Sequence, residues 1–296
     1  MMRNLFPQSL ILGAALLCAV PGAVTAQAAD DPLARLHGES GRLRAVIARA
    51  GSETERMLER LFPNALLAHA ARVPGLYDLG SPAPGGEPMV LLSLVPFEAK
   101  HGEALHGYRL GRWPQETAAG SRNEYARPDG FVEVTPATAR MPVSARFRLG
   151  DFVTHYQADV WPKYVVLRTP LIDKLELVGA ALTAAGKADS LRVMSGFRTP
   201  AYNARGVRPG GGRAADSRHM YGDASDIFVD ADGDGRMDDL DGDGRVTVGD
   251  ARWLAGLIEQ VEIQHPDLVG GLSAYPATSE HGPFVHTDVR GRAARW

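Results

Sequence analysis

Apolar residues recur at helical spacing in two stretches of the second half of the chain, and each stretch predicts a helix with one buried face. The apolar positions of the first stretch are Leu171, Leu175, Val178 and Leu182. Those of the second stretch are Leu254, Leu257, Ile258 and Val261. We expect the first helix to begin at Thr169-Pro170, because Thr caps helices well and Pro fits the first turn, and to end at Gly186.

Short apolar runs predict strands on both sides of these helices. In the second half the expected strands cover residues 191–195, 225–229 and 284–289, and in the first half 89–95, 108–110 and 131–134. A helical pattern covers residues 32–72, interrupted by Gly38, Gly41 and Gly51. This mixture predicts an α+β chain, in which residues 29–140 form an accessory α/β region of unknown role and residues 141–296 form a second domain.

The composition is that of a globular protein. With 296 residues the chain can form one large or two modest domains, and its formal net charge is -3. Because the sequence has no basic block and no basic-aromatic stripe, nucleic acid is not an expected partner.

The first 28 residues have the features of a secretory signal peptide. Arg3 supplies positive charge, the apolar run from Leu10 to Val20 is too short to span a bilayer comfortably, and small residues at 24–28 offer cleavage sites. The alternative is an uncleaved anchor. The only cysteine, Cys18, lies within this segment, so the mature protein would have no disulfide and no thiolate metal ligand. We therefore expect a periplasmic or secreted protein with no stable membrane insertion after cleavage.

Two histidines and a carboxylate form the most informative set of polar residues. His219 and Asp226 are seven residues apart, a spacing typical of a loop ligand followed by a strand ligand, and Gly222 permits the turn between them. His286 on the last expected strand completes a set of three, and Asp288 on the same face is expected to orient a ligand imidazole. Catalytic zinc sites use three such ligands and leave a fourth position for water. Alternatively, these are unrelated histidines and a turn-capping aspartate.

The segment from Ser217 to Asp226 resembles the Ser-x-His-x-x-Gly-x-Ala-x-Asp signature of the D-alanyl-D-alanine metallopeptidases, the superfamily that includes the hedgehog signalling domain. Residues 195–200, Ser-Gly-Phe-Arg-Thr-Pro, and 284–288, Phe-Val-His-Thr-Asp, are similar to two further motifs of that family, and most of all to those of the bacterial murein endopeptidases. The resemblance covers about residues 145–296. It implies a small antiparallel sheet that carries a zinc site and is flanked by helices. It also implies zinc ligands at His219, Asp226 and His286, a supporting role for Ser217, and a guanidinium at Arg198 that faces the substrate.

The sequence departs from many members of this family at one position. They have an acidic residue three positions before the last histidine, where this chain has Pro283, which cannot act as a base. Glu280 and His281 match the offsets of an acid and a histidine in other members. We therefore expect Glu280 to act as the general base and His281 to support the transition state. Alternatively, both are loop residues without a catalytic role.

A second informative stretch has eight aspartates within the 21 residues from Asp230 to Asp250. Their spacing matches a calcium-binding loop twice. The first loop would use Asp230, Asp232, Asp234, Asp238 and Asp241, and the second would use Asp239, Asp241, Asp243, Thr247 and Asp250. Met237 and Val246 supply the apolar eighth position of each loop. Because the loops overlap at Asp239 and Asp241, filling of one loop can prevent filling of the other.

The second loop leads into the expected helix and resembles a dockerin-type calcium loop, although a dockerin has two separated copies. We interpret residues 230–262 as a calcium-binding insert in the peptidase domain. The alternatives are a solvated acidic loop and a docking module.

The predicted function is an exported zinc-dependent peptidase that hydrolyses the stem peptides or cross-links of peptidoglycan. A D-alanyl-D-alanine carboxypeptidase is the alternative enzyme. A calcium-stabilised cell-wall-binding or docking protein without activity is the alternative from another class, and Pro283 is the residue that favours it.

Overall fold

The computed structural model describes residues 44–49, 52–62, 73–80, 88–116, 125–209 and 212–296. The expected signal peptide at 1–28 and the first part of the accessory region lie outside these residues. In the ranges just given, no helix combines the length and the hydrophobicity needed to cross a membrane. The prediction of a mixed α+β chain with small sheets is confirmed.

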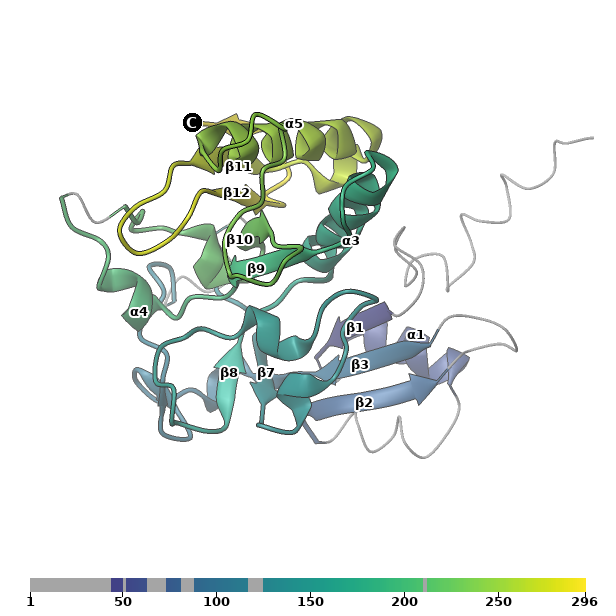
Figure 1. The fold of residues 1–296 in the computed structure, drawn as a ribbon. Coiled ribbons are helices and arrows are strands. Elements are labelled where there is room, and N and C mark those ends of the chain that lie inside the picture. The colour runs from purple at the N-terminus through teal and green to yellow at the C-terminus, as the bar shows by residue number, and fades with distance from the viewer. Residues whose placement is uncertain (1–43, 50–51, 63–72, 81–87, 117–124, 210–211) are drawn as a thin grey trace, which may run out of the picture.

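The described chain forms two lobes, which lie one above the other in Figure 1. The strands of the N-terminal lobe are β1 (Arg44–Ala48), β2 (Gly75–Gly80), β3 (Met89–Ser93), β4 (Val95–Pro96), β5 (Ala104–Leu105), β6 (Tyr108–Arg109), β7 (Gly130–Val134) and β8 (Lys163–Val165). They form small sheets with the strand orders β1-β3-β2, β4-β7-β8 and β5-β6. The helical elements of this lobe are α1 (Glu53–Leu61) and the 3-10 turns η1 (Phe97–Ala99), η2 (Thr138–Arg140) and η3 (Leu149–Phe152).

One segment that the pattern predicts to be helical is a strand in the structure. Residues 44–48 form β1, which pairs in parallel with β3 along its full length. Strand β3 is buried throughout and also pairs with β2, so its backbone needs partners on both sides. This non-local pairing outweighs the helical spacing of the apolar residues. A later part of the pattern is helical as predicted, because α1 begins at Glu53 after the cap residue Ser52.

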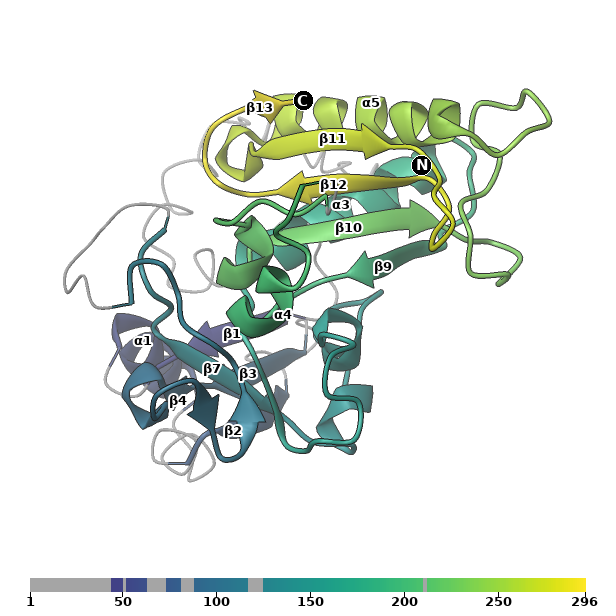
Figure 2. The same ribbon diagram turned by 90° about the vertical axis from the view of Figure 1, so that its left-hand side faces the viewer.

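The C-terminal lobe is built on a five-stranded sheet. Its strands are β9 (Leu191–Ser195), β10 (Ala224–Val229), β11 (Gly271–Tyr275), β12 (Phe284–Asp288) and β13 (Ala294–Arg295). Their order is β13-β11-β12-β10-β9, and all neighbours are antiparallel except β11 and β13. Helices α3 (Thr169–Ala184) and α5 (Val248–Gln264) lie behind the sheet in Figure 2, and η5 (Pro266–Leu268) follows α5. In front of it lie α4 (Pro200–Ala204) and η4 (Arg218–Tyr221).

The sequence patterns account for the two long helices. The four apolar residues predicted for α3 are all buried, and Gly186 has a φ of +72°, which ends the helix. The cap differs from the prediction: the cap residue is Arg168, whose side chain makes no capping hydrogen bond, and Thr169 is the first residue of the helix. Helix α5 begins with a reciprocal capping box between Thr247 and Asp250.

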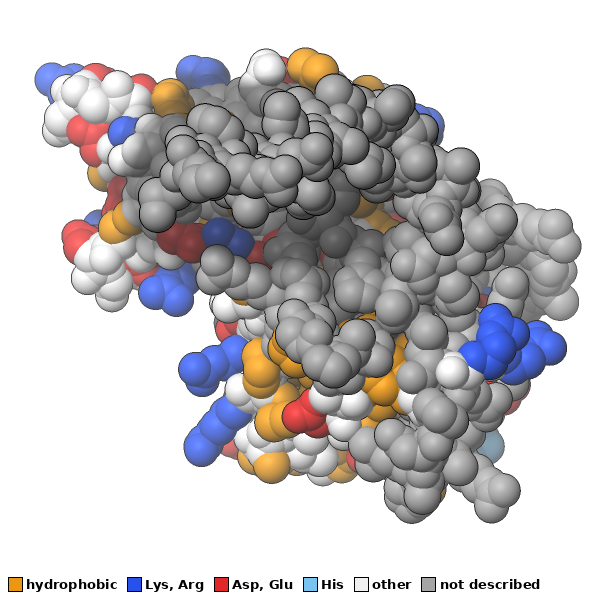
Figure 3. Space-filling model, turned by 90° about the vertical axis from the view of Figure 1, so that its right-hand side faces the viewer, with side chains coloured by type: hydrophobic (Ala, Val, Ile, Leu, Met, Phe, Trp, Pro, Cys, Tyr) orange, Lys and Arg blue, Asp and Glu red, His pale blue; other side chains and the backbone are white. Residues whose placement is uncertain are grey.

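A continuous hydrophobic core extends through both lobes. It includes Phe131 and Tyr164 of the N-terminal lobe, and Leu175 and Ile258 of the two long helices. The chain returns to the N-terminal lobe after residue 140, because β8 pairs with β7. On the face turned to the viewer in Figure 3, the described hydrophobic side chains gather over the N-terminal lobe, and Lys and Arg side chains stand near the edges.

The N-terminal lobe also supports segments of the C-terminal lobe through hydrogen bonds. The indole Nε1 of Trp113 donates to the carbonyl oxygen of Met220 over 2.8 Å, and both groups are buried. The backbone N–H of Ala201 donates to the carbonyl oxygen of Leu110 over 2.9 Å. Residues of the accessory region therefore fix the backbone of both η4 and α4.

Candidate metal centre

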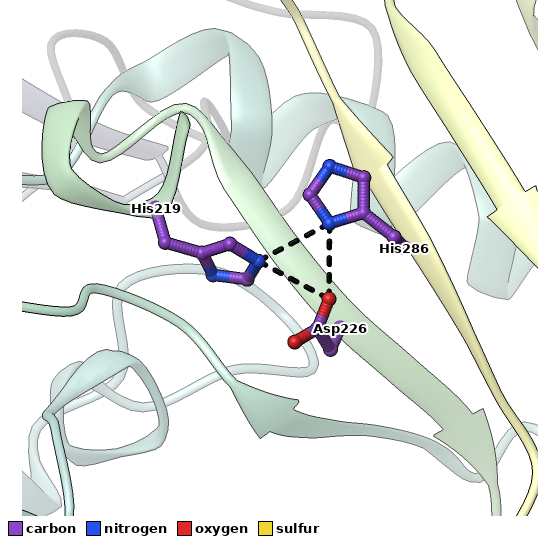
Figure 4. A group of neighbouring side chains, drawn as sticks. All are labelled: His219, Asp226 and His286. Carbon is purple, nitrogen blue, oxygen red and sulfur yellow. Dashed lines mark hydrogen bonds and ion pairs between the residues drawn. The ribbon is translucent and has the colours of Figure 1, made fainter. Parts of the chain in front are cut away.

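A left-handed turn at the end of η4 positions His219 against the sheet. Gly222 follows η4 with a φ of +70°, a conformation that favours glycine. A Cβ at this position would lie 2.4 Å from the carbonyl carbon of Val166, so no larger residue fits. The imidazole of His219 is buried, and its Nδ1 hydrogen bonds to the carbonyl oxygen of Gly196 over 2.7 Å. This contact turns Nε2 toward Asp226, as Figure 4 shows.

The register of the sheet places Asp226 and His286 side by side. Asp226 on β10 is the direct partner of His286 on the antiparallel strand β12, so both side chains lie on one face of the sheet. The pairing of β10 with β9 shifts register just after Asp226. Figure 4 shows the two imidazoles and the carboxylate turned toward one common point. Residues that are 67 and 60 positions away from His286 in the sequence thus meet it in space.

Three possible ligand atoms form a nearly equilateral triangle. His219 Nε2 lies 3.1 Å from Asp226 Oδ1 and 3.2 Å from His286 Nδ1. The third side, from His286 Nδ1 to Asp226 Oδ1, is 3.0 Å. All three residues are buried. Ligand atoms at these separations can surround a metal ion at about 2.0–2.2 Å from each of them.

Hydrogen bonds on the outer side of each imidazole determine which nitrogen carries a proton. The carbonyl oxygen of Gly196 can only accept, so Nδ1 of His219 is the donor. The Nε2 of His286 donates to Asp288 Oδ2 over 3.3 Å. The inner nitrogen of His219 therefore presents a lone pair to the carboxylate of Asp226, and the inner nitrogen of His286 does the same once that ring carries a single proton. Two lone pairs and a negative charge repel at this separation, and a cation between them removes the repulsion.

The carboxylate and the two imidazoles shift one another's pKa. Burial and the charge of Arg198 lower the pKa of His219 to about 4, so this ring is neutral at pH 7. Burial raises the pKa of Asp226, but His219 and Arg198 outweigh it and keep the pKa well below its usual value. Burial lowers the pKa of His286, but hydrogen bonds to Asp226 and Asp288 outweigh it and raise the pKa. Because a cation in the triangle competes with a proton on His286, metal binding would release that proton.

Arg198 contacts one of the three candidate ligands. Its Nη2 donates to Asp226 Oδ2, and its Nε donates to Ser195 Oγ over 2.9 Å. The side chain is 14% exposed and lines the pocket beside the triangle. The guanidinium therefore reaches both a candidate ligand and the space in which a substrate would lie.

Asp288 holds His286 from the side away from the triangle. Its carboxylate is buried and accepts from the backbone N–H of Gly271 over 2.7 Å and from Arg290 Nε over 2.9 Å. Burial raises the pKa of Asp288, but hydrogen bonds from His286 and Arg290 outweigh it and hold the pKa well below its usual range. Asp288 is therefore a carboxylate at neutral pH and can only accept hydrogen bonds. The buried ammonium of Lys174 donates to the backbone carbonyl oxygen of Asp288 over 2.8 Å.

A pocket of about 790 Å³ opens beside the triangle. Glu280 and His281 both line it, in the same pocket as Arg198. Glu280 is exposed, and His281 packs edge-on against Phe284 with the ring centroids 4.9 Å apart. Ser217 is buried and also lines the pocket. The structure thus brings the expected catalytic residues to the pocket of the candidate ligands.

The pocket also has an aromatic wall, which the folded sheet assembles from distant parts of the sequence. Tyr275 stacks on Phe284 with the ring centroids 4.8 Å apart, and the ring of Trp296 lies 5.4 Å from that of His286. The Nε1 of Trp296 donates to the hydroxyl of Tyr275 over 2.6 Å. These aromatic residues come from β11, β12 and the segment after β13, so only the folded sheet brings them together.

Two groups of carboxylates lie in the segment from the end of β10 to the first turn of α5. In each group, one oxygen per residue lies within 4.8 Å of the others; the groups are Asp230, Asp232 and Asp234, and Asp239, Asp241 and Asp250. Asp241 belongs to the second group, and the two groups share no residue. The larger, overlapping ligand sets expected from spacing stay predictions. The two apolar positions also differ from each other: Met237 is 2% exposed and packs in the core, whereas Val246 is 48% exposed.

Three other residues of the acidic segment accept hydrogen bonds from the backbone. They are Asp238, which accepts from Ala231 N over 2.8 Å, Asp243, which accepts from Arg245 N over 2.8 Å, and Thr247, which accepts from Gly249 N over 2.9 Å. Burial and the nearby carboxylates of Asp232 and Asp230 raise the pKa of Asp238. Negative charge is therefore concentrated in this segment.

Comparison with known proteins gives no relative of this chain. No protein-family model matches it, and no curated protein or solved structure gives a significant match. What marks the site is its geometry: three buried residues, His219, Asp226 and His286, could hold a metal ion, and so could each of the two carboxylate groups.

Proposed function

We propose that this chain is a zinc-dependent peptidase that hydrolyses the peptides of peptidoglycan, either stem peptides or cross-links. The observation that carries the proposal is the triangle of His219 Nε2, Asp226 Oδ1 and His286 Nδ1, with sides of 3.0–3.2 Å, beside an open pocket. Two neutral imidazoles and a carboxylate suit zinc, and three ligands leave one position open for chemistry. The peptide substrate is proposed from the motif resemblance around these ligands.

Each residue near the triangle has a proposed part in the reaction. Zinc held by the three ligands would supply a Lewis acid that polarises a carbonyl and acidifies water. Glu280 is proposed to accept the proton of the attacking water, and His281 to donate a hydrogen bond to the developing negative charge. Arg198 is proposed to bind a carboxylate of the substrate or the oxyanion, since its guanidinium reaches the pocket while it contacts Asp226.

The two carboxylate groups between β10 and α5 are proposed to bind Ca²⁺. Calcium prefers oxygen ligands, and loops that alternate aspartate with glycine present them at the required spacing. Export to the periplasm or the medium is also proposed, from the first 28 residues of the sequence. Fractionation of cells that make the full chain would test this location.

Digestion of purified sacculi tests the proposed enzyme. The zinc-loaded protein is expected to release muropeptides, and removal of the metal by a chelator is expected to stop the release until zinc is added back. His219→Ala is expected to lose activity, because it removes one of the three ligands. His101→Ala is the matched control, since His101 is exposed in the N-terminal lobe. If the wild-type protein binds sacculi and releases no fragment, the chain is a binding protein and the proposed activity is wrong.

A second candidate activity is the release of a terminal D-alanine. Arg198 and Arg213 both line the pocket, and a guanidinium there suits a substrate that ends in a free carboxylate. Mass analysis of the released muropeptides separates the two activities. Loss of a single alanine indicates a carboxypeptidase, whereas conversion of dimers to monomers indicates an endopeptidase.

A further inference from the structure

The first carboxylate group begins directly after the strand that carries Asp226. Strand β10 ends at Val229, and Asp230 is the next residue. One oxygen from each of Asp230, Asp232 and Asp234 lies within 4.8 Å of the others. Three like charges at this separation repel, so the folded loop needs positive charge at the point where the carboxylates meet.

Asp230 gives independent evidence of a ligand in this loop. Its side chain is 6% exposed, and its Oδ2 accepts a hydrogen bond from Gly235 N over 3.3 Å. Its Oδ1 is buried and has no hydrogen-bond partner among the described residues. A buried carboxylate oxygen without a partner is strongly unfavourable, because it has lost water and gained nothing in return. A bound cation would supply the missing partner.

The second group lacks this feature. Asp250 is fully buried, but its Oδ1 accepts from Leu240 N over 2.7 Å and its Oδ2 accepts from Thr247 N over 2.7 Å. The carboxylate that corresponds to Asp230 in the second loop is Asp239, which accepts from Gly242 N and Gly244 N with both oxygens. The structure therefore assigns the stronger need for a cation to the first loop.

The first loop is anchored at both ends of its turn. Asp238 N donates to the carbonyl oxygen of Val229 over 2.9 Å, which closes the loop onto the end of β10. Met237 is buried in the hydrophobic core beside this closure. The backbone that carries the carboxylates is thus fixed by a hydrogen bond to β10 and by the packing of Met237 in the core.

The loop also lies beside the rim of the pocket, which we define as residues 276–282. Pro276, Thr278, Glu280 and His281 of this rim line the pocket. A Cβ placed on Gly282 would lie 3.8 Å from Met237 N and 3.9 Å from Arg236 Cβ, so the rim lies beside the loop at Gly282. The same loop is therefore joined to Asp226 through β10 and lies next to the segment that carries Glu280.

We propose that Ca²⁺ binds the first loop through Asp230, Asp232 and Asp234, and that the bound ion fixes the pocket rim against the strand that carries Asp226. Calcium suits this loop because all the available side-chain ligands are carboxylate oxygens. The effect on turnover rests on the proposed peptidase function. The binding of calcium and the ordering of the rim do not depend on it.

Hydrogen–deuterium exchange on zinc-loaded, calcium-free protein tests this proposal. Addition of CaCl₂ is expected to slow exchange in peptides that cover 227–240 and 276–282. Asp234→Asn is expected to raise the calcium concentration that gives half of the protection in both peptides by at least about tenfold, because it removes one of three charged ligands. Asp243→Asn is the matched control, since Asp243 is exposed in the second loop and accepts the same type of backbone hydrogen bond, 2.8 Å long, as Asp234.

Each outcome decides between the proposals. Calcium protection of both peptides that is lost in Asp234→Asn and kept in Asp243→Asn supports the assignment, whether or not the protein digests sacculi. No change in exchange on addition of calcium overturns it, as does equal loss in both variants. If calcium protects the rim but zinc-loaded protein releases no muropeptides, the calcium site stands and the peptidase function fails.

Discussion

Replacement of Asp288 by asparagine is expected to disrupt metal binding without changing a metal ligand. In the wild-type protein, one carboxylate oxygen accepts from Gly271 N over 2.7 Å and the other accepts from His286 Nε2 over 3.3 Å. Asparagine can keep its carbonyl oxygen against Gly271, but its amide N–H then meets the N–H of His286. Two donors cannot form a hydrogen bond, so His286 is driven to the tautomer with its proton on Nδ1. That proton occupies the triangle where the metal would bind.

The size of the effect follows from this tautomer change. Substitution of groups that hydrogen bond to a ligand imidazole lowers metal affinity by about 10–100-fold, which corresponds to about 1.4–2.7 kcal/mol. We expect Asp288→Asn to fall in this range, because Asp288 is fully buried and water cannot replace its hydrogen bond. The zinc dissociation constant, measured by competition with a fluorescent chelator, gives the effect directly.

Thr287→Val is the control for this measurement. Thr287 is the neighbouring residue, is also fully buried, and its hydroxyl has no hydrogen-bond partner in the described part of the chain. Valine has nearly the same shape, so the variant is expected to keep its zinc affinity and its stability. If Asp288→Asn binds zinc as tightly as the wild-type protein while Thr287→Val is folded, the proposed role of Asp288 is refuted.

Two further predictions concern the frame around the candidate metal centre. Gly222→Ala is expected to cost about 3 kcal/mol or more in unfolding free energy, because it combines a left-handed backbone with a clash against Val166. Gly186→Ala has the same type of backbone and open space around it, so it is expected to cost about 1–2 kcal/mol, and equal losses in both variants would contradict the clash. Trp113→Phe leaves the buried carbonyl of Met220 without a donor and is expected to cost about 1–3 kcal/mol; urea denaturation that shows no loss would refute this.

The second half of the fold follows from local sequence patterns to a large extent. Helices α3 and α5 lie where apolar residues recur at helical spacing, and strands β9, β10 and β12 lie where short apolar runs predict them. The three candidate ligands could also be found from their motifs. Gly222 permits the turn between His219 and Asp226, and His286 lies in the separate motif at 284–288. Short sequence patterns are sufficient to predict the place of a side chain where one helix, strand or turn determines it.

Contacts between distant elements could not be predicted in this way. Strand β1 was expected to be helical, and only its pairing with β3 makes it a strand. The aromatic wall of Tyr275 and Trp296 depends on the order of strands in the sheet, which apolar spacing does not report. Met237 packs in the hydrophobic core and Asp250 takes part in the capping box of α5, and the spacing of the aspartates predicts neither contact.

The hydrogen bond from Trp113 to Met220 joins the accessory region to η4, the turn that carries His219 of the candidate metal centre. A ligand that binds only the folded state stabilises every segment that unfolds together with its site, by about 4 kcal/mol at a free concentration of 1,000 times the dissociation constant. We therefore expect zinc to raise the melting temperature of the whole two-lobed unit, including strands β1 to β3, which contribute no ligand. A spectroscopic probe placed in the N-terminal lobe would then report metal binding at a distance. The accessory region and the candidate metal centre would unfold together, at a temperature that depends on the zinc concentration.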